Sequence, residues 1–307
     1  MAYERYGRER ERRDNFERSA YRSRDQHGGR GACGGKAQRR NQVQVFNKRL
    51  EGECAVHGAY HNYYERRNID VNNFIESDFR CNAVREEDIK NKVCLDIGCN
   101  EGLVGINLAA AYGSSKMLGL DVDEKLIRKA EENLALRKRK EADKAKERGH
   151  DDDGTYAKVA KALDGCTFMS GNFRFKSPIV HKKGEYDTII CLSVMKWIHL
   201  NYGDKGVEFV LKWFNLVLKV GGLLILEFQN MQSYKNAKGK KELREHFGEG
   251  KKLIEPTTLK INPENFPQML MDKYSFEHER QAEKSDTDRT FTGRNVYFFR
   301  KQQDIKE

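Results

Sequence analysis

Residues 93–102 constrain the fold of this chain more than any other segment. The run from Val93 to Ile97 is mostly apolar and predicts a strand that is buried on both faces. Gly98 and Gly102 follow this run, and residues 103–112 then carry apolar side chains at helical spacing. A strand that turns on glycines into a helix forms a cradle of nucleotide size, because glycine lets the backbone approach a ligand and a helix N-terminus offers unpaired N–H groups.

The spacing of the two glycines indicates which nucleotide the cradle holds. Dinucleotide-binding enzymes carry Gly-x-Gly-x-x-Gly, whereas here Asn100 holds the place of the second glycine and Asp96 comes two residues before Gly98. This pattern resembles motif I of class I methyltransferases, whose cofactor is S-adenosylmethionine. Asp121 ends the next predicted strand, where a carboxylate accepts hydrogen bonds from ribose hydroxyls. A doubly wound protein with an acidic turn and another ligand is the alternative.

Strands and helices alternate after residue 93, which predicts a mainly parallel sheet covered by helices. Two strands near the C-terminus have no long helix between them, as in the antiparallel end of the seven-stranded, Rossmann-like sheet of class I methyltransferases. The charged stretch 137–164 interrupts the alternation; we predict an insertion with a solvated helix there, and phosphate binding is the alternative. Strands are expected at residues 93–97, 117–121, 166–170, 186–192, 222–228, 274–280 and 295–300, and helices at 102–112, 123–140 and 204–219.

The net charge of +10 is distributed unevenly along the chain. Residues 1–40 hold eleven arginines and one lysine against six acidic residues, so this stretch carries +6. We therefore predict an Arg/Gly-rich disordered tail at 1–45 and a methyltransferase domain at 46–303. Arginines interleaved with aromatic residues suit phosphate contacts and base stacking, and a purely solubilising tail is the alternative.

The seven cysteines contain no C-x-x-C pair, and Cys54 with His57 is only half of a metal site. We expect structural thiols in a reduced intracellular protein and no bound metal. The chain contains no apolar run of membrane-spanning length, so no membrane association is expected.

Residues 186–201 distinguish this chain from a generic methyltransferase. The apolar run of this segment ends at Leu192, and ligands of open α/β sheets bind at the carboxyl ends of the strands. We therefore expect Ser193, Lys196, Trp197 and His199 at the mouth of the site. A lysine supplies a positive charge for a phosphate, and a tryptophan can stack or wall off the methyl donor. The tyrosines and arginines of residues 60–67 suit a flap over the cofactor, and a surface helix would explain them equally well.

Five stretches together resemble the RNA methylphosphate capping enzymes of the Bicoid-interacting-protein-three family. The resemblance covers about residues 46–301, and the Leu-Ser-x-x-Lys-Trp-x-His-Leu-Asn string is its most specific part. The stretches are Gly58-Ala-Tyr60 with Tyr63-Tyr64 and Arg67-Asn68, Leu95 to Asn100, Gly171-Asn172-Phe173, Cys191 to Asn201, and Leu226-Glu227-Phe228-Gln229. The chain departs from the family at Glu65 and Arg66. It departs again at Asn230 and Met231, two positions at which the family has proline and tryptophan.

The resemblance implies transfer of a methyl group from S-adenosylmethionine to the terminal (gamma) phosphate at the 5′ end of a small non-coding RNA. It also implies a monomer that acts in the nucleus or the cytoplasm, with a protein partner in a ribonucleoprotein as a further implication. The implied cofactor contacts are Tyr64, Arg80, Gly98, Cys99, Asn100, Asp121, Val122, Asn172, Phe173 and Leu192. The implied catalytic residues are Tyr63, Arg67, Lys196 and Trp197, and the implied RNA contacts are Arg294 and a loop of Ser233, Tyr234 and Lys235.

The chemistry of such a transfer requires no general base. A terminal phosphate oxygen is already anionic near neutral pH, so the enzyme needs only to align it with the sulfonium methyl group and balance the charge. We assign this alignment to Lys196, Arg67 and the Tyr63 hydroxyl. The alternatives are methylation of a 5′-monophosphate, a methyltransferase of the same fold that acts on a protein or a small molecule, and a non-catalytic RNA-binding scaffold.

Overall fold

The computed structural model describes residues 63–65, 68–148, 154–171, 181–239, 253–282 and 294–305. All of them belong to one compact unit, residues 48–307. The predicted tail at 1–45 lies outside the described residues, as do Arg67, Asn172 and Phe173. Within the described part of the chain, no helix is both long and apolar enough to cross a membrane.

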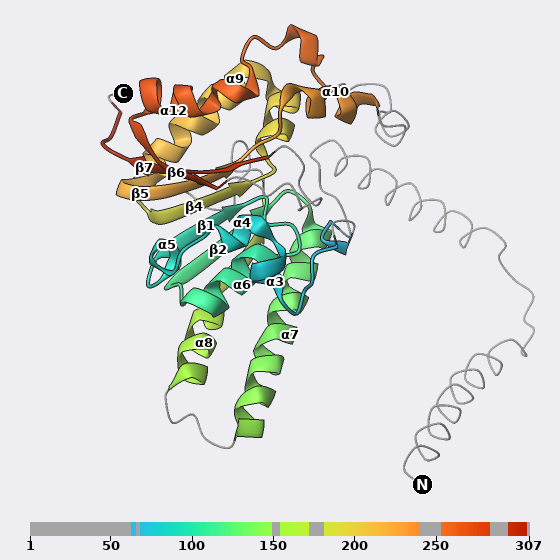
Figure 1. The fold of residues 1–307 in the computed structure, drawn as a ribbon, viewed down its shortest axis with the longest axis vertical. Helices are drawn as coiled ribbons and strands as arrows, with labels where there is room; N and C mark the ends of the chain where they lie inside the picture. Colours follow the sequence, from blue (N-terminus) through green and yellow to red (C-terminus); the bar gives the residue numbers. More distant parts are fainter. Residues whose placement is uncertain are drawn as a thin grey trace, which may run out of the picture. The chain divides into compact units, whose positions relative to one another are not determined.

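A seven-stranded sheet with the order β3-β2-β1-β4-β5-β7-β6 forms the centre of this unit (Figure 1). Strands β1 to β5 are parallel, and β7 pairs antiparallel with both β5 and β6. The predicted fold, a mainly parallel seven-stranded sheet whose last strand is antiparallel, is therefore confirmed. The strands are β1 (Val93–Ile97), β2 (Lys116–Asp121), β3 (Cys166–Ser170), β4 (Tyr186–Leu192), β5 (Leu218–Glu227), β6 (Phe276–Ala282) and β7 (Val296–Lys301).

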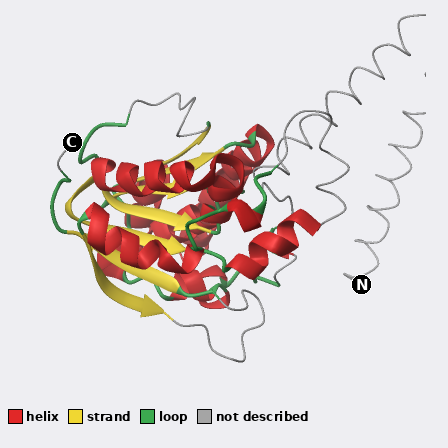
Figure 2. Cartoon of the chain, turned by 90° about the horizontal axis from the view of Figure 1, so that it is seen from above, coloured by secondary structure: helices red, strands yellow, loops and turns green. Residues whose placement is uncertain are grey.

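Helices cover both faces of the sheet, as Figure 2 shows from above. One face packs on α3 (Phe74–Ser77), α4 (Phe79–Asn82), α5 (Glu86–Ile89), α6 (Leu103–Tyr112), α7 (Glu124–Arg148) and α8 (Thr155–Asp164). The other face packs on α9 (Met195–Val217) and α12 (Phe266–Tyr274), and short 3-10 turns lie at Pro256–Thr258 and Pro263–Asn265. Each face of the sheet therefore carries a large hydrophobic core, the first under α3 to α8 and the second under α9 and α12. Successive strand side chains point to opposite faces, so Cys94 belongs to the first core and Leu95 to the second. This explains the nearly continuous apolar runs of the central strands.

The stretch 137–164 differs from the predicted solvated insertion. Helix α7 continues to Arg148, and α8 returns along it, so the two helices form a hairpin that projects from the sheet (Figure 1). Leu163 is completely buried in the first core, and Arg137 donates a hydrogen bond to Oδ1 of Asn107 on α6 at 2.7 Å. The predicted solvated helix is therefore partly buried, at the ends of the hairpin that meet the sheet.

Helix α9 begins earlier than predicted. Residues 195–203 extend the expected helix 204–219 toward its N-terminus, and Gly203 interrupts its helical geometry with φ 64° and ψ −165°. The first part of α9 carries a small third core, which also includes residues of α10 (Met231–Gly239). This core consists of Trp197, Leu200, Tyr234, Ala237 and Leu253.

Candidate active site

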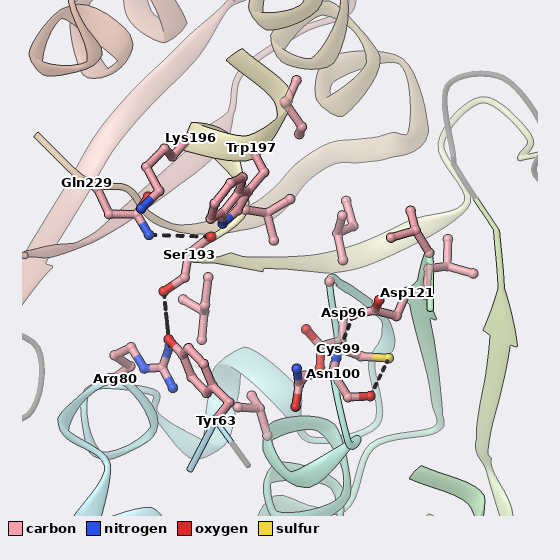
Figure 3. A pocket seen from close by; sticks show the side chains of 18 of the residues that line it. Tyr63, Arg80, Asp96, Cys99, Asn100, Asp121, Ser193, Lys196, Trp197 and Gln229 are labelled. Atoms are coloured by element: carbon pink, nitrogen blue, oxygen red, sulfur yellow. Dashed lines mark hydrogen bonds between the residues drawn. The ribbon is translucent and has the colours of Figure 1, made fainter. Parts of the chain in front are cut away.

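A cavity of about 360 Å³ opens at the carboxyl ends of β1, β2, β4 and β5 (Figure 3). Its two ends differ chemically. The glycine turn after β1 and the acidic end of β2 line one end, and the first turn of α9, the residues after β5 and helix α10 line the other. Figure 3 shows Asp96, Asn100 and Asp121 grouped apart from Lys196 and Gln229. We call these the cofactor end and the acceptor end.

Backbone geometry brings the glycine turn close to any ligand in the cofactor end. Gly98 has φ 70°, and a methyl group on it would lie 2.4 Å from Cγ2 of Val194, so no larger residue fits. The N–H groups of Gly98 and Cys99 donate to the carbonyl oxygen of Leu120 at 2.7 and 3.0 Å. These bonds fix the turn against the end of β2. The cradle expected from the glycine spacing is therefore present.

Two buried carboxyl groups face the cofactor end. Asp121 accepts hydrogen bonds from the N–H groups of Asn100 and Asp123 at 2.9 and 3.0 Å. Burial raises the pKa of Asp121 to about 6, against these hydrogen bonds. Burial also raises the pKa of Asp96 to about 7, opposed by the nearby positive charge of Arg80. Among the described residues, Oδ2 of Asp96 has no hydrogen-bond partner. A ligand with amino and hydroxyl donors, such as S-adenosylmethionine, would satisfy both carboxylates.

A hydroxyl and carboxylate network connects the cofactor end with the acceptor end. Ser193 follows β4 with φ 65°, and its Oγ donates to Oε2 of Glu227 at 2.5 Å. The same Oγ lies 3.1 Å from the Tyr63 hydroxyl and accepts from Nη1 of Arg294 at 3.0 Å. Arg294 also donates to Oε1 of Glu227 at 3.3 Å. Glu227 is completely buried, and its two carboxylate oxygens accept hydrogen bonds from Ser193 and Arg294, which fix its position.

Arg80 lies behind this network with only 2% of its surface exposed. Its Nε and Nη2 donate to the two carboxylate oxygens of Asp78 at 2.9 and 2.6 Å, a bidentate pair. Its Nη1 lies 3.4 Å from the Tyr63 hydroxyl and 3.9 Å from Oε2 of Glu227. Arg80 therefore lines the cavity, with its charge largely balanced by Asp78.

Lys196 is the cation on the first turn of α9. It is 7% exposed, and its Nζ donates to Oγ of Ser233 at 3.2 Å. The same ammonium lies 4.9 Å from the ring centroid of Trp197, a cation–π distance. Gln229 follows β5 and is 3% exposed; its Nε2 donates to the carbonyl oxygen of Ser193 at 3.4 Å. The acceptor end thus presents an ammonium group, hydroxyls and an amide.

Thirteen of the eighteen predicted site residues line the cavity, and the predicted loop at 233–235 needs correction. That segment is helical, because Tyr234 and Ala237 pack on α9. The Tyr234 side chain is completely buried, and Lys235 is exposed outside the cavity lining. His199 was expected at the mouth of the site, but it is completely buried and does not line the cavity. The lining residues are Tyr63, Tyr64, Arg80, Gly98, Cys99, Asn100, Asp121, Val122, Leu192, Lys196, Trp197, Ser233 and Arg294.

Sequence reasoning assigned no site role to Asp78, Asp96, Glu227 or Gln229. Asp96, Glu227 and Gln229 lie inside motifs that were recognised, so their position at strand ends was an available signal. Asp78 had no such signal, because its role depends on the fold bringing Arg80 next to β4 and β5.

Comparison with known proteins agrees with this geometry. Residues 95–224 match the family model of a methyltransferase domain, and residues 186–301 match the model of Bicoid-interacting protein 3 (Bin3). The chain is a methyltransferase whose residues 186–301 resemble the Bin3 family. Its cofactor is S-adenosylmethionine, as predicted.

Curated relatives of this chain include RNA-modifying enzymes. The "Probable RNA methyltransferase" of Arabidopsis thaliana is 29% identical over 75% of this chain and 75% of its own length. The U6 snRNA methylphosphate capping enzyme Amus of Drosophila melanogaster is 28% identical over 70% of this chain and 64% of its own length. The 7SK snRNA methylphosphate capping enzyme of Mus musculus is 27% identical over 80% of this chain. The aligned region spans only 40% of that enzyme.

Proposed function

We propose that this protein transfers a methyl group from S-adenosylmethionine to the terminal (gamma) phosphate at the 5′ end of a small non-coding RNA, giving a methylphosphate cap. One observation carries the proposal: the buried Lys196 ammonium and the Tyr63 hydroxyl lie in the same cavity as the glycine turn. A buried cation beside hydroxyl donors matches a phosphate better than it matches a neutral acceptor. The names of the relatives support an RNA with a phosphate at its end.

The reaction is an in-line displacement at carbon. A lone pair of a phosphate oxygen forms the new O–C bond, and the C–S bond breaks with its electron pair going to sulfur. The sulfonium becomes a neutral thioether, S-adenosylhomocysteine, and the phosphate loses one negative charge. No proton moves, so no base is needed, and no histidine is found among the described residues that line the cavity. Alignment of the two reactants supplies a barrier reduction on the order of 7–11 kcal/mol.

The proposed roles follow from where the side chains lie. Lys196 holds the negative charge of the phosphate, and Trp197 packs beside the ammonium as a wall of the acceptor end. Tyr63 donates its hydroxyl hydrogen to a phosphate oxygen when the substrate replaces its contact with Ser193. Arg67 lies outside the described residues and keeps its proposed role as a phosphate ligand on the strength of the family resemblance alone.

We further propose a division of labour along the chain. The methyltransferase domain at 46–303 selects the 5′ end, and the basic tail at 1–45 adds sequence-independent contacts to RNA phosphates. Action on small nuclear RNA would place the protein in the nucleus, as a monomer that joins a ribonucleoprotein.

A panel of matched RNAs tests the proposal. One short RNA is prepared with a 5′-triphosphate, a 5′-monophosphate or a 5′-hydroxyl end, and each form is incubated with the protein and methyl-labelled S-adenosylmethionine. We expect label on the triphosphate RNA, and enzymatic removal of the gamma phosphate should remove that label. Equal labelling of the 5′-hydroxyl RNA, or label that remains on the RNA body, would contradict the proposal. Labelling of the monophosphate RNA alone would move the acceptor from the gamma to the alpha phosphate.

A further inference from the structure

Helix α10 forms much of the acceptor end, yet it belongs to neither of the two large cores. Ser233, Asn236 and Ala237 of this helix line the cavity. Tyr234, which does not line the cavity, packs together with Ala237 into the small third core against Trp197 and Leu200 of α9. The placement of the helix therefore depends on a few contacts to the first part of α9 and to residues 253–259.

The buried ring of His199 makes a second polar contact between α9 and α10, beside the hydrogen bond from Lys196 to Ser233. Its Nε2 lies 2.9 Å from Oδ1 of Asp204, and its Nδ1 lies 3.4 Å from the Tyr234 hydroxyl. Burial lowers the pKa of His199, opposed by Asp204, so the ring is neutral near pH 7. A carboxylate only accepts, so Nε2 carries the hydrogen and Nδ1 accepts from the Tyr234 O–H. The two rings also meet edge to face, with centroids 5.5 Å apart.

Asp204 extends this chain of hydrogen bonds to a third segment. Its carboxylate accepts from the N–H groups of Lys260 and Ile261, both at 3.0 Å. The segment after the 3-10 turn at 256–258, the kinked part of α9 and helix α10 are thus joined through one imidazole ring. The residue before Tyr234, Ser233, faces the cavity, where its Oγ accepts a hydrogen bond from Nζ of Lys196 at 3.2 Å.

We propose that His199 and Tyr234 form a latch that positions α10, and that this latch sets the geometry of the acceptor end without affecting cofactor binding. Both are positioning residues, because neither lines the cavity. Rotation of α10 about its axis would move the Ser233 hydroxyl away from the Lys196 ammonium and so displace the charge that meets the phosphate. The inference rests on the proposed function only for the identity of the acceptor, a 5′-phosphate RNA. The existence of the latch does not depend on the proposed function.

The chain offers a matched control for removing the latch. His181 and Tyr186 form a second histidine–tyrosine hydrogen bond, at 2.9 Å, and Tyr186 is a buried residue at the amino end of β4, opposite the cavity. Tyr234→Phe and Tyr186→Phe each remove one hydroxyl and nothing else. Thermal unfolding of both variants shows whether each is folded and how much stability each has lost.

Three measurements separate a latch from a merely structural contact. Hydrogen exchange of residues 231–239 should become faster in Tyr234→Phe and stay unchanged in Tyr186→Phe. In steady-state kinetics, Tyr234→Phe should raise the KM for 5′-phosphate RNA by about fivefold or more, the factor that corresponds to one neutral hydrogen bond. The Kd for S-adenosylhomocysteine should stay within about twofold of the unmutated value, a change smaller than a typical hydrogen bond.

The outcomes are distinguishable. Exchange and S-adenosylhomocysteine binding require no turnover, so they test the latch even if the unmutated protein labels no phosphate-ended RNA. Equal exchange of residues 231–239 in the two variants would overturn the latch. A loss of cofactor affinity in Tyr234→Phe as large as the rise in RNA KM would overturn its restriction to the acceptor end.

Discussion

Lowering the pH from 8 to 6 should weaken binding of S-adenosylhomocysteine to the free protein. Burial raises the pKa of Asp96 to about 7 and that of Asp121 to about 6. Both carboxyl groups face the cofactor end, where amino and hydroxyl donors of the ligand favour the ionised forms. Binding therefore lowers both pKa values, and protons leave the protein as the ligand binds. Below the raised pKa values this release opposes binding, so affinity falls as pH falls.

The pKa values give the size of the effect. A group with a pKa of about 7 is about one-tenth ionised at pH 6 and about nine-tenths ionised at pH 8, so Asp96 alone contributes about a tenfold change in affinity. Asp121 is about half ionised at pH 6 and contributes a further factor of about two. Together they predict about twentyfold weaker binding at pH 6 than at pH 8, roughly 1.8 kcal/mol.

Titration calorimetry at pH 6, 7 and 8, in two buffers that differ in ionisation enthalpy, measures the affinity and the number of protons released. Asp96→Asn is the matched control, because the amide keeps the size of the side chain and removes its titration. The control should bind more weakly at pH 8 and show a change of only about twofold between pH 8 and pH 6, the part due to Asp121. Protonation of the ligand itself affects both proteins equally, so it cancels when the pH dependence of the unmutated protein is compared with that of Asp96→Asn. Equal affinities of the unmutated protein at pH 6 and pH 8, with no proton release, would refute the reasoning.

Four further outcomes are expected. Asp121→Ala should weaken S-adenosylhomocysteine binding by roughly 1.5–3 kcal/mol in calorimetry, and an unchanged Kd in a folded variant would remove this carboxylate from the site. Lys196→Ala should lower kcat/KM on triphosphate RNA by about 30-fold or more with the cofactor Kd unchanged, whereas Lys212→Ala, an exposed lysine of the same helix, should retain full activity. Deletion of residues 1–40 should reduce the salt slope of RNA binding in fluorescence anisotropy by about 0.7–0.9 per lost phosphate contact, and coinciding slopes would exclude the tail from RNA binding. Lys301→Met should lower the free energy of unfolding in urea by about 2–3 kcal/mol, because the buried ammonium donates to two main-chain carbonyls at the end of α9; a loss below about 0.5 kcal/mol would show those carbonyls to be satisfied otherwise.

The sequence predicted the sheet well because its central strands are buried on both faces. The predicted bounds of β1, β3 and β4 are those of the structure. The prediction was less good for β5, which begins four residues earlier than expected. Leu218 is buried, but residues 219–221 are exposed and end at Gly221 with φ 77°, so they lack the apolar pattern that marks a strand.

Helices that depend on tertiary contacts were harder to predict. The sequence of α10 is polar, with a serine and an asparagine, and suggested a loop. It is helical because two of its side chains, three positions apart, pack on α9. The beginning of α9 was missed for a related reason, since the glycine at 203 separates it from the strongly amphipathic part of the helix.

The candidate site also contains residues that the sequence could identify and contacts that it could not. The glycine turn and Asp121 were found because the residues involved are contiguous or end adjacent strands. The network of Ser193, Glu227 and Arg294 joins three distant segments, and only the fold brings them together. No local pattern reports which carboxylate balances which arginine, so the pairing of Arg80 with Asp78 could not be inferred.

The two ends of the cavity differ in how firmly the fold holds them. Main-chain hydrogen bonds between neighbouring central strands fix the cofactor end, and the two large cores support it. The acceptor end rests on a helix segment set apart by Gly203 and on α10, which a small core and single hydrogen bonds hold in place. Segments with few buried contacts open at lower free energy than core strands. Methyl transfer to an already anionic oxygen depends on alignment rather than on proton transfer. Small displacements of the acceptor end should therefore change which RNA ends react, while the affinity for the cofactor stays nearly constant.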